Sequence, residues 1–477
     1  MRTVSAVSLV CCLVAIVAAH GAEEALGSLG QVRETLAATP AAIDNYEERC
    51  RILAALDGYL ERPYSERSVP VAEYYRAMIG AALEDIATRR VDDGVVLWKL
   101  YSSSMVVKTP TVTFGIDLDH TPNSGSGGPD KTIGQGGMRL HMTPEQIARL
   151  ARLVDVSFHS HRHHDHIDYA ITRALLDAGK TVVVPEDIRT MWRDEPFAQK
   201  LTVLDPSLGN SHRIEGLTVE VFAGAQWMAA DHSLRCPCNA YLIETGNDVG
   251  VLFKGDINDG EDIGPWLHDL KARGKTIDLY VSSLLYWWGA DAMPQMQRTF
   301  DPFLIPGHEY EFTHRKPGEA GSGTGSYASR CDRFRSDAAR GKAVVLSWGE
   351  AFHYRPALHR KARAPLVWID LSPEPGEVRL RAGESFAVDF RARAHGVKIN
   401  RYYLAYSKTD AVRNLPGFED RDWGGIIHDP DKDGKFTVST KGWPPGTHVF
   451  DCVVDDWPGG SHRSKSRLSV TVVADDA

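Results

Sequence analysis

The stretch SFHSHRHHDHIDYA (residues 157–170) constrains the fold of this chain more than any other feature. Five histidines fall within eight positions, and Asp165 directly precedes the last of them. The preceding run VDVSFHSH is typical of a short strand, and Asp168 is suited to cap a helix over DYAITRALLDAG. We therefore expect the histidines at the C-terminal end of a strand, between two rigid elements. A solvated, histidine-rich loop is the alternative interpretation.

The centre of the chain, residues 93 to 355, alternates strand and helix patterns, which predicts an α/β domain. VVLWKLYSSSMVV and TVTFGIDLD have the composition of strands. MTPEQIARLARLV contains Thr143, Pro144 and Gln146 at the spacing of a capping box with proline in the first helical position. This helix leads directly into the histidine-bearing strand.

Residues 1–21 carry a single charge, Arg2, before the apolar run VSAVSLVCCLVAIVAA and the small-residue stretch AAHGA. This pattern predicts a secretory signal peptide with the mature chain starting near Ala22, although an uncleaved anchor is an alternative. We expect an exported protein, periplasmic or extracellular, without stable membrane insertion after signal removal. Oligomeric state is not readable from the sequence.

Residues 22–92 are predicted to form a helical N-terminal segment. Thr39 is interpreted as a helix cap with Pro40 in the first turn, and Pro63 and Pro70 are expected to separate this helix from a second one. Apolar residues recur at helical spacing at positions 43, 46, 50, 53, 56 and 60. Both helices are expected to pack on the central domain.

The C-terminal part begins after a basic, proline-bounded linker at residues 356–365. Residues 366–477 read as short alternating strands, with apolar positions 386, 388 and 390, then 450, 452 and 454, then 468, 470 and 472. An immunoglobulin-like β-sandwich is the predicted fold. Within it, DPDKDG resembles the start of a calcium loop but has Thr440 at the twelfth position, so we interpret it as an ordinary turn.

Charge and cysteine content narrow the partners and the compartment. The formal net charge is -9 and no basic block interrupts it, so we expect no nucleic-acid partner. A small-molecule or cell-surface substrate is favoured instead. Five cysteines follow the signal, at positions 50, 236, 238, 331 and 452. Their odd number leaves at least one without a partner in the chain, and the pairing stays open.

Three further residues downstream suit a metal site. His232 precedes the strand NAYLIET, Asp256 ends the strand VGVLFKGD, and His308 follows the apolar run FLIPG. His161, His163, Asp165 and His166 form the motif H-x-H-x-D-H. A site with two metal ions needs further ligands beside this motif, and the presence of such residues argues against the solvated loop.

The ordered set resembles the metallo-β-lactamase superfamily of metal-dependent hydrolases over residues 93–355. The resemblance implies an αββα sandwich with the active site at one edge of the two central sheets. It also implies one metal bound by His161, His163 and His232, a second bound by Asp165, His166 and His308, and Asp256 bridging the two. Asp117 matches the early acidic residue that supports the metal loop, with Asp119 as the alternative.

The chemistry of this ligand set favours zinc, because neutral imidazoles outnumber carboxylates; iron and manganese are alternatives. A hydroxide shared by two ions would attack an anionic or polarised ester, with Asp165 and Asp256 as the catalytic carboxylates. His163 stands where di-iron relatives carry glutamate, which favours hydrolysis. Asp256 stands where antibiotic-cleaving relatives commonly have cysteine, so a lactone or phosphoester is favoured over a β-lactam.

The alternative function is a surface- or polysaccharide-binding protein with a structural metal site. Seven candidate ligands are more than the four that such a site needs, which disfavours this alternative. His159 and His164 are interpreted as neighbours of the site rather than ligands. Cys236 and Cys238 are interpreted as structural cysteines, with metal binding or a cross-link as alternatives, and His314 as an exposed polar residue, with a place in the pocket lining as the alternative. Aromatic residues 286–288 suit either a sugar contact or the core, and the glycine-rich residues 121–137 suit a rim of the active site.

Overall fold

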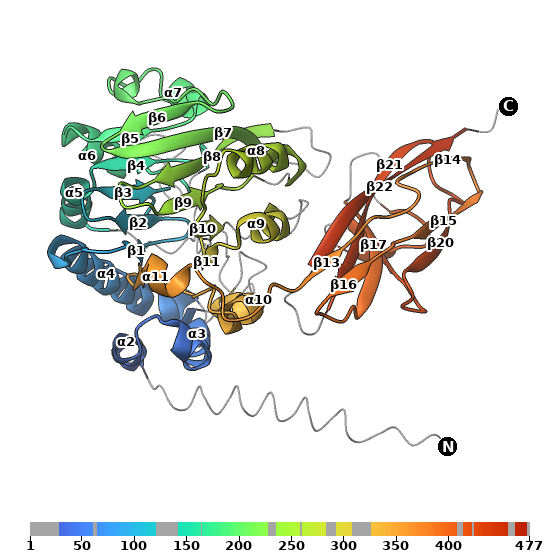
Figure 1. Cartoon of the computed structure of the whole chain (residues 1–477), viewed down its shortest axis with the longest axis horizontal. Coiled ribbons are helices and arrows are strands. Elements are labelled where there is room, and N and C mark those ends of the chain that lie inside the picture. Colours follow the sequence, from blue (N-terminus) through green and yellow to red (C-terminus); the bar gives the residue numbers. More distant parts are fainter. Residues whose placement is uncertain are drawn as a thin grey trace, which may run out of the picture.

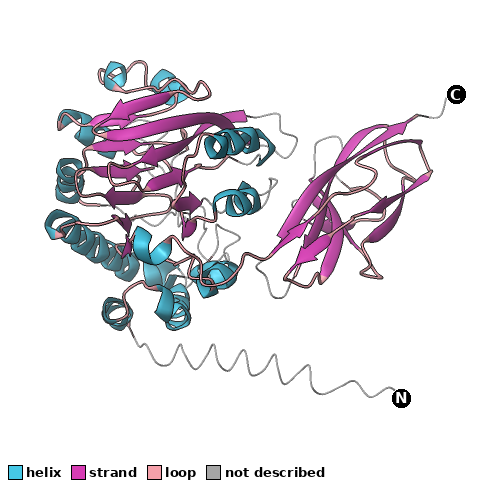
Figure 2. Cartoon of the chain, in the orientation of Figure 1, coloured by secondary structure: helices cyan, strands magenta, loops and turns pink. Residues whose placement is uncertain are grey.

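The computed structural model describes residues 28–60, 64–120, 142–163, 165–227, 235–257, 260–282, 292–307, 326–407, 414–421, 424–456 and 463–474. An α/β domain is followed by a smaller β domain, and the two lie side by side in Figure 1 and Figure 2. The predicted signal peptide lies outside the described residues. No helix among the described residues is long and apolar enough to cross a membrane.

The α/β domain contains two six-stranded sheets. The first has the order β12-β1-β2-β3-β4-β5, and the second has the order β11-β10-β9-β8-β7-β6. The strands of the first are β1 (Val95–Lys99), β2 (Met105–Lys108), β3 (Thr113–Ile116), β4 (Val156–Phe158), β5 (Thr181–Val183) and β12 (Ala351–Tyr354). Those of the second are β6 (Ser211–Ile214), β7 (Leu217–Trp227), β8 (Arg235–Glu244), β9 (Gly250–Phe253), β10 (Leu279–Ser282) and β11 (Phe303–Pro306).

Helices cover the outer faces of both sheets. α4, α5 and α6 lie beside the first sheet, and α8 and α9 lie beside the second (Figure 1). The helices are α2 (Leu29–Ala38), α3 (Tyr46–Leu60), α4 (Tyr64–Thr88), α5 (Pro144–Leu153), α6 (Tyr169–Asp177), α7 (Glu186–Met191), α8 (Gly260–Ala272), α9 (Ala292–Phe300), α10 (Tyr327–Ala339) and α11 (Pro356–His359). The described residues also contain two single-turn 3-10 helices, Ile43–Asn45 and Ala198–Lys200. The predicted order of layers, helix, sheet, sheet, helix, is present.

Strand periodicity explains the two cores of this domain. Alternate residues such as Leu97, Phe114 and Phe158 meet residues of the second sheet between the two sheets. The rings of Phe158 and Tyr241 lie 5.7 Å apart across this layer. Intervening residues such as Trp98 face the other way and join the helix-facing core. The central strands are therefore buried on both faces, which is why they read as continuous apolar runs.

Two boundaries predicted in the N-terminal segment are wrong. Ser28 caps α2 by accepting a hydrogen bond from the Gln31 amide, so a helix runs up to Ala38 and Thr39 is its C-terminal cap. Pro40 thus ends a helix rather than starting one, as prolines that follow a C-cap often do. Pro70 lies inside α4, not before it. Its ring is exposed to solvent, which lets the helix accommodate it.

The N-terminal helices are bound tightly to the α/β domain. A disulfide between Cys50 and Cys331 joins α3 to α10. The Asp57 carboxylate accepts hydrogen bonds from the backbone amides of Tyr327 (2.9 Å) and Ala328 (2.8 Å), at the N-terminus of α10. Such a carboxylate satisfies otherwise open amide donors. The predicted packing of this segment on the central domain is confirmed.

The β domain has its own hydrophobic core, and the predicted inward positions of its strands are buried there. Its largest sheet has the order β14-β22-β21-β17-β19-β18, and β15 pairs with β20 and β13 with β16. Its strands are β13 (Trp368–Asp370), β14 (Glu377–Arg381), β15 (Ser385–Asp389), β16 (Arg393–His395), β17 (Arg401–Ser407), β18 (Glu419–Arg421), β19 (Gly424–His428), β20 (Lys435–Ser439), β21 (Gly446–Asp455) and β22 (Arg463–Val473). The immunoglobulin-like topology stays a prediction.

The DPDKDG stretch of the β domain forms a turn, as predicted. The Asp429 carboxylate accepts hydrogen bonds from the amides of Asp431 and Gly434, at 3.0 and 2.7 Å. Lys432 and Gly434 take up positive φ angles of 57° and 80°. The carboxylate is therefore engaged in closing the turn.

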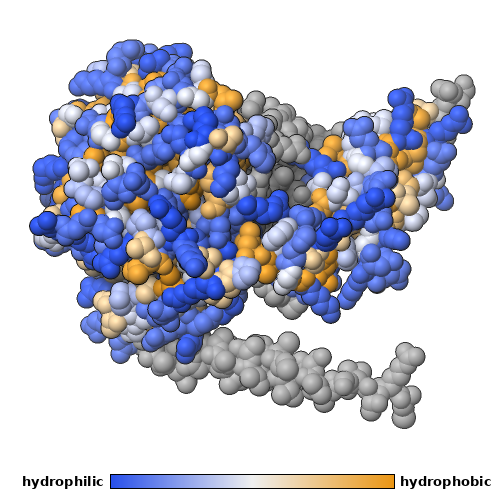
Figure 3. Space-filling view, viewed as in Figure 1, coloured by the Kyte–Doolittle hydropathy of each residue, from blue (hydrophilic) through white to orange (hydrophobic). Residues whose placement is uncertain are grey.

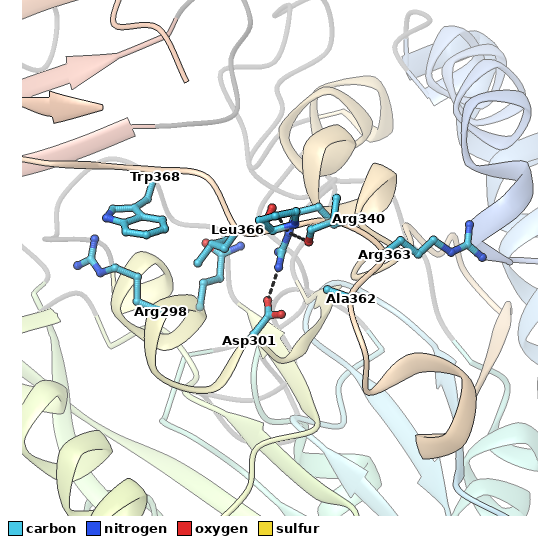
Figure 4. A pocket seen from close by; sticks show the side chains of 10 residues that line it. Arg298, Asp301, Arg340, Ala362, Arg363, Leu366 and Trp368 are labelled. Carbon is cyan, nitrogen blue, oxygen red and sulfur yellow. Dashed lines mark hydrogen bonds and ion pairs between the residues drawn. The ribbon is translucent and has the colours of Figure 1, made fainter. Parts of the chain in front are cut away.

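The linker at residues 356–365 is attached to the α/β domain along its length. The guanidinium of Arg360 donates to the buried Asp278 carboxylate at 2.7 Å, and that of Arg363 donates to Asp44 at 2.7 Å. Arg340, paired with Asp301 at 2.8 Å, also donates to the carbonyls of residues 364 and 365. Arg340, Asp301 and Arg363 are among the residues that line a cavity of about 540 Å³, which reaches Trp368 (Figure 4).

The surface that Figure 3 shows is mainly hydrophilic on both domains, with apolar residues scattered among the charged ones. Because the apolar cores of the two domains are distinct, the α/β domain has no need of the β domain to bury its own core.

A chain ending at residue 366 should keep the fold of the α/β domain, whereas one ending at residue 359 should be less stable. The shorter chain lacks Arg360, so the buried Asp278 carboxylate loses the hydrogen bonds that this guanidinium donates. Leaving these buried acceptors without a donor costs about 1–3 kcal/mol. Thermal unfolding followed by circular dichroism compares the two. Loss of folded protein in the longer chain would show that the β domain completes the α/β core.

The double substitution Cys50→Ala and Cys331→Ala should lower the free energy of unfolding by about 2–4 kcal/mol, because the disulfide limits the freedom of the unfolded chain. Denaturant titration measures this difference. Reductant should weaken the wild type to the same degree and leave the double variant unchanged. Equal stability of oxidised wild type and variant would contradict the expectation.

Candidate metal centre

The candidate site lies where strands of both sheets end. The loop after β4 supplies the histidine motif, the turn after β3 supplies Asp117, and the loop after β9 supplies Asp256. β3 and β4 are parallel, so their C-terminal ends meet at one edge of the first sheet. β8 of the second sheet holds the histidine loop there: the Asn239 amide donates to the Ser160 carbonyl at 2.8 Å, and the Tyr241 hydroxyl donates to the His159 carbonyl at 3.0 Å.

His161 and His163 face each other at the centre of this edge. Nε2 of His161 lies 2.8 Å from Nδ1 of His163, and their rings are nearly perpendicular at 76°. Nδ1 of His161 lies 3.0 Å from the Ser160 hydroxyl. The two-residue spacing thus places one ring nitrogen of each histidine at a common point.

His166 occupies the other half of the site. Its Nε2 lies 3.3 Å from an Asp165 oxygen and 3.3 Å from Oδ2 of Asp256. The same Asp256 oxygen is 4.0 Å from Nε2 of His161. Ligand atoms of His161, His166 and Asp256, all buried, lie within 4.8 Å of one another. Asp256 therefore lies between the His161–His163 pair and His166.

Asp117 holds this arrangement from behind. Its carboxylate accepts hydrogen bonds from the Ser160 amide (2.6 Å) and hydroxyl (2.8 Å), and it lies 2.7 Å from Nδ1 of His166. The backbone of Asp117 has a φ of 43°, a left-handed conformation that aspartate tolerates better than most residues. The carboxylate fixes the His166 ring with Nε2 facing Asp256, the usual role of a carboxylate behind a metal-binding histidine.

Asp119, the alternative to Asp117, is also buried, and its backbone amide and carbonyl both contact the Ser104 hydroxyl. The contacts to Ser160 and His166 are made by Asp117.

Gly255 allows the Asp256 loop to approach the histidine loop. Its φ is 52°, and a Cβ at this position would lie 2.3 Å from Cβ of Ser160 and 2.9 Å from Sγ of Cys238. Any side chain here would force the two loops apart. The glycine before Asp256 is thus required by both backbone conformation and space.

The charges of the site prepare its imidazoles for metal binding. Burial, with the neighbouring His166 and His163, holds the pKa of His161 well below its ordinary value, and burial lowers the pKa of His163. Both rings are therefore neutral, as metal ligands must be. Burial alone would lower the pKa of His166, but Asp165, Asp256 and Asp117 outweigh it and raise that pKa well above the ordinary value.

The raised pKa of His166 shows that its three surrounding carboxylates stabilise positive charge at this point. A divalent ion supplies such charge directly, so the donor set fits a metal. Nε2 of His163 adds to the fit, since it is buried and accepts or donates no hydrogen bond within the described part of the chain.

The structure brings together five of the seven predicted ligands: His161, His163, Asp165, His166 and Asp256. His232 and His308 lie outside the described residues, as do His164, His314 and residues 286–288. His159 is not part of the cluster, because its ring nitrogens contact the Ser157 hydroxyl and the His166 carbonyl, at 2.9 Å each.

Three further residues lie at the site although none of them was predicted to take part in it. Ser160 links Asp117 to both His161 and His166, and Cys238 places its Sγ 3.6 Å from Nδ1 of His161. Burial raises the pKa of the Cys238 thiol well above its ordinary value, so it stays protonated. Gln226 of β7 donates to Asp256 at 2.9 Å. Serine, cysteine and glutamine occur in strands and loops for many reasons, so spacing alone did not identify these three as part of the site.

No protein-family profile matches the sequence, and no curated protein sequence matches it. Among solved structures, the chain is similar to a possible metal-dependent hydrolase from Veillonella parvula DSM 2008, with 13% identity and a TM-score of 0.38 over 55% of this chain and 100% of that one. The metallo-beta-lactamase fold protein YhfI from Bacillus subtilis is similar over 55% of this chain and 100% of its own, at 12% identity and a TM-score of 0.35.

A third similar structure is CmlA, a diiron beta-hydroxylase from Streptomyces venezuelae, with 12% identity and a TM-score of 0.36 over 56% of this chain and 55% of that one. The similar solved structures thus include both named hydrolases and this hydroxylase. Likeness at this level carries no argument about the reaction, which has to be drawn from the side chains of the site itself.

Proposed function

We propose that this chain is an exported, binuclear metal-dependent hydrolase of the metallo-β-lactamase fold. The observation that carries the proposal is the convergence of His161, His163, Asp165, His166 and Asp256 at one buried point where strands of both sheets end. A structural zinc site would need four ligands in a closed set. Four donors gathered around the central carboxylate of Asp256, with Asp117 behind them, fit a pair of ions better.

The residues of the site would bind two separate metal ions. His161 and His163 would hold one ion, Asp165 and His166 the other, and Asp256 would lie between them. His232 and His308 would complete the two sets, as the resemblance implies. When bound, two divalent ions, zinc by preference, supply Lewis acidity and activate water for attack. The protein keeps His161 and His163 neutral, orients His166 through Asp117 and encloses the ligands in a buried setting.

The substrate class follows from charge. Two divalent ions offset by Asp165 and Asp256 leave a net positive centre, which favours an anionic or strongly polarised ester. A lactone or phosphoester is preferred over a β-lactam, because Asp256 stands where antibiotic-cleaving relatives commonly have cysteine. A panel of lactones, phosphodiesters and β-lactams, run on the zinc-loaded mature protein, tests this preference.

Export is supported by the disulfide between Cys50 and Cys331, since such bonds persist in oxidising compartments and are rare in the cytosol. The β domain would present the enzyme to its surroundings or contact a surface polymer. The alternative, a surface- or polysaccharide-binding protein with a structural metal, predicts binding without turnover in the same substrate panel.

Asp256→Ala should lower occupancy of at least one metal position and remove most turnover, because both halves of the site depend on this carboxylate. The expected wild-type content is two ions per chain, and chelation should abolish hydrolysis. Elemental analysis and rate measurement on the same preparations provide the check.

His212→Ala is the matched control, since His212 lies on β6 and contacts the Asp205 carbonyl instead of the site. It should keep both ions and the wild-type rate. One ion or none in the zinc-loaded wild type would rule out the binuclear site, and full metal content with normal turnover in Asp256→Ala would rule out the bridging role.

A further inference from the structure

Gln226 makes a contact that the proposed ligand set does not include. It lies one residue before the end of β7, in register with Cys236 of β8. Its Nε2 donates a hydrogen bond to Oδ2 of Asp256 at 2.9 Å. The contact joins a residue of a long, paired strand to the carboxylate at the centre of the site.

The oxygen that Gln226 contacts is the one that lies between the histidines. Oδ2 of Asp256 is 3.3 Å from Nε2 of His166 and 4.0 Å from Nε2 of His161. Rotation of this carboxylate about its last bond would move Oδ2 away from one side or the other. Gln226 is fixed on β7, so its hydrogen bond to Oδ2 can form in only one orientation of the carboxylate. This hydrogen bond therefore opposes the rotation.

The chemistry of the two groups sets the orientation of the Gln226 amide. An ionised carboxylate only accepts hydrogen bonds, so the amide nitrogen must face Asp256 and the amide oxygen must point elsewhere. That oxygen, Oε1, is buried and accepts no hydrogen bond from the described residues. A buried acceptor without a donor costs about 1–3 kcal/mol, so the pair is a poor device for stabilising the fold alone.

Gly224 allows β7 to lie close to the Asp256 loop. A Cβ on Gly224 would lie 2.8 Å from Cδ1 of Ile257, the residue after Asp256. The strand therefore approaches the loop more closely than a side chain at position 224 would permit. This close approach puts the side chain two residues further along, Gln226, within reach of Asp256.

We propose that Gln226 is a positioning residue that fixes the Asp256 carboxylate in the orientation needed to serve both metal positions. The inference rests on the proposed function, because it presupposes that Asp256 binds metal. Residues that hold a metal ligand in place typically change metal affinity 10- to 100-fold when removed. Gln226 acts through Asp256, and no contact with substrate is implied.

The test is Gln226→Met, which keeps a side chain of similar length and removes the donor. Gln297→Met is the matched control. Gln297 makes the same kind of bond, from Nε2 to the Asp337 carboxylate at 2.9 Å, but on α9 beside the linker cavity. Zinc affinity is measured by competition with a chromophoric chelator, and thermal unfolding is recorded on the metal-free proteins.

The expected result is a 10- to 100-fold loss of affinity for at least one zinc ion in Gln226→Met, with a metal-free unfolding temperature equal to that of the wild type. Gln297→Met should retain wild-type affinity. Unchanged zinc affinity in Gln226→Met would overturn the proposal. So would an affinity loss matched by a fall in the metal-free unfolding temperature, since that pattern marks a merely structural role.

Wild-type metal content separates this inference from the proposed function. Fewer than two ions in the wild type counts against the binuclear hydrolase, and a single bound ion still allows the two glutamine variants to be compared. No bound ion overturns both. Two wild-type ions with unchanged affinity in Gln226→Met count against the positioning role alone.

Discussion

The carboxylate of Asp117 is the contact on which the geometry of the site depends. It joins the end of β3 to the loop after β4 by accepting two hydrogen bonds from Ser160, and it lies against Nδ1 of His166. One anion thereby sets the path of the histidine loop and the direction of one imidazole. Without it, the loop would lose its anchor and the His166 ring would be free to turn away from Asp256.

Much of this architecture is readable from the sequence because it follows from local rules. The capping box at Thr143 and Gln146 and the cap at Asp168 are present as predicted, and they fix the helices on either side of the histidine strand. Asp117, Asp165, His166 and Asp256 converge because parallel strands place their C-terminal ends at one edge. Motif spacing and strand order thus carry most of the information about the site.

The features that escaped prediction depend on contacts between distant residues. Thr39 is suited to cap either end of a helix. Because Ser28 upstream caps the N-terminus of α2, Thr39 lies at the C-terminal end of that helix. The basic composition of the linker did not identify a partner for it, yet Arg360 contacts the buried Asp278, 82 residues away in sequence. Gln226 is similar: nothing in the strand pattern distinguishes it until β7 and the Asp256 loop are placed side by side. Tertiary proximity, not residue type, gives these positions their roles.

The disulfide of α3 and α10 imposes an order on the maturation of the chain. Its two cysteines are separated by 281 residues, so nearly the whole α/β domain is synthesised before Cys50 can meet Cys331. Cys236 and Cys238 emerge earlier and are eligible partners for Cys50 in an oxidising environment. In the folded domain both are buried in β8. Rapid pairing of β7 with β8 would therefore protect the protein against a mispaired thiol at the site itself.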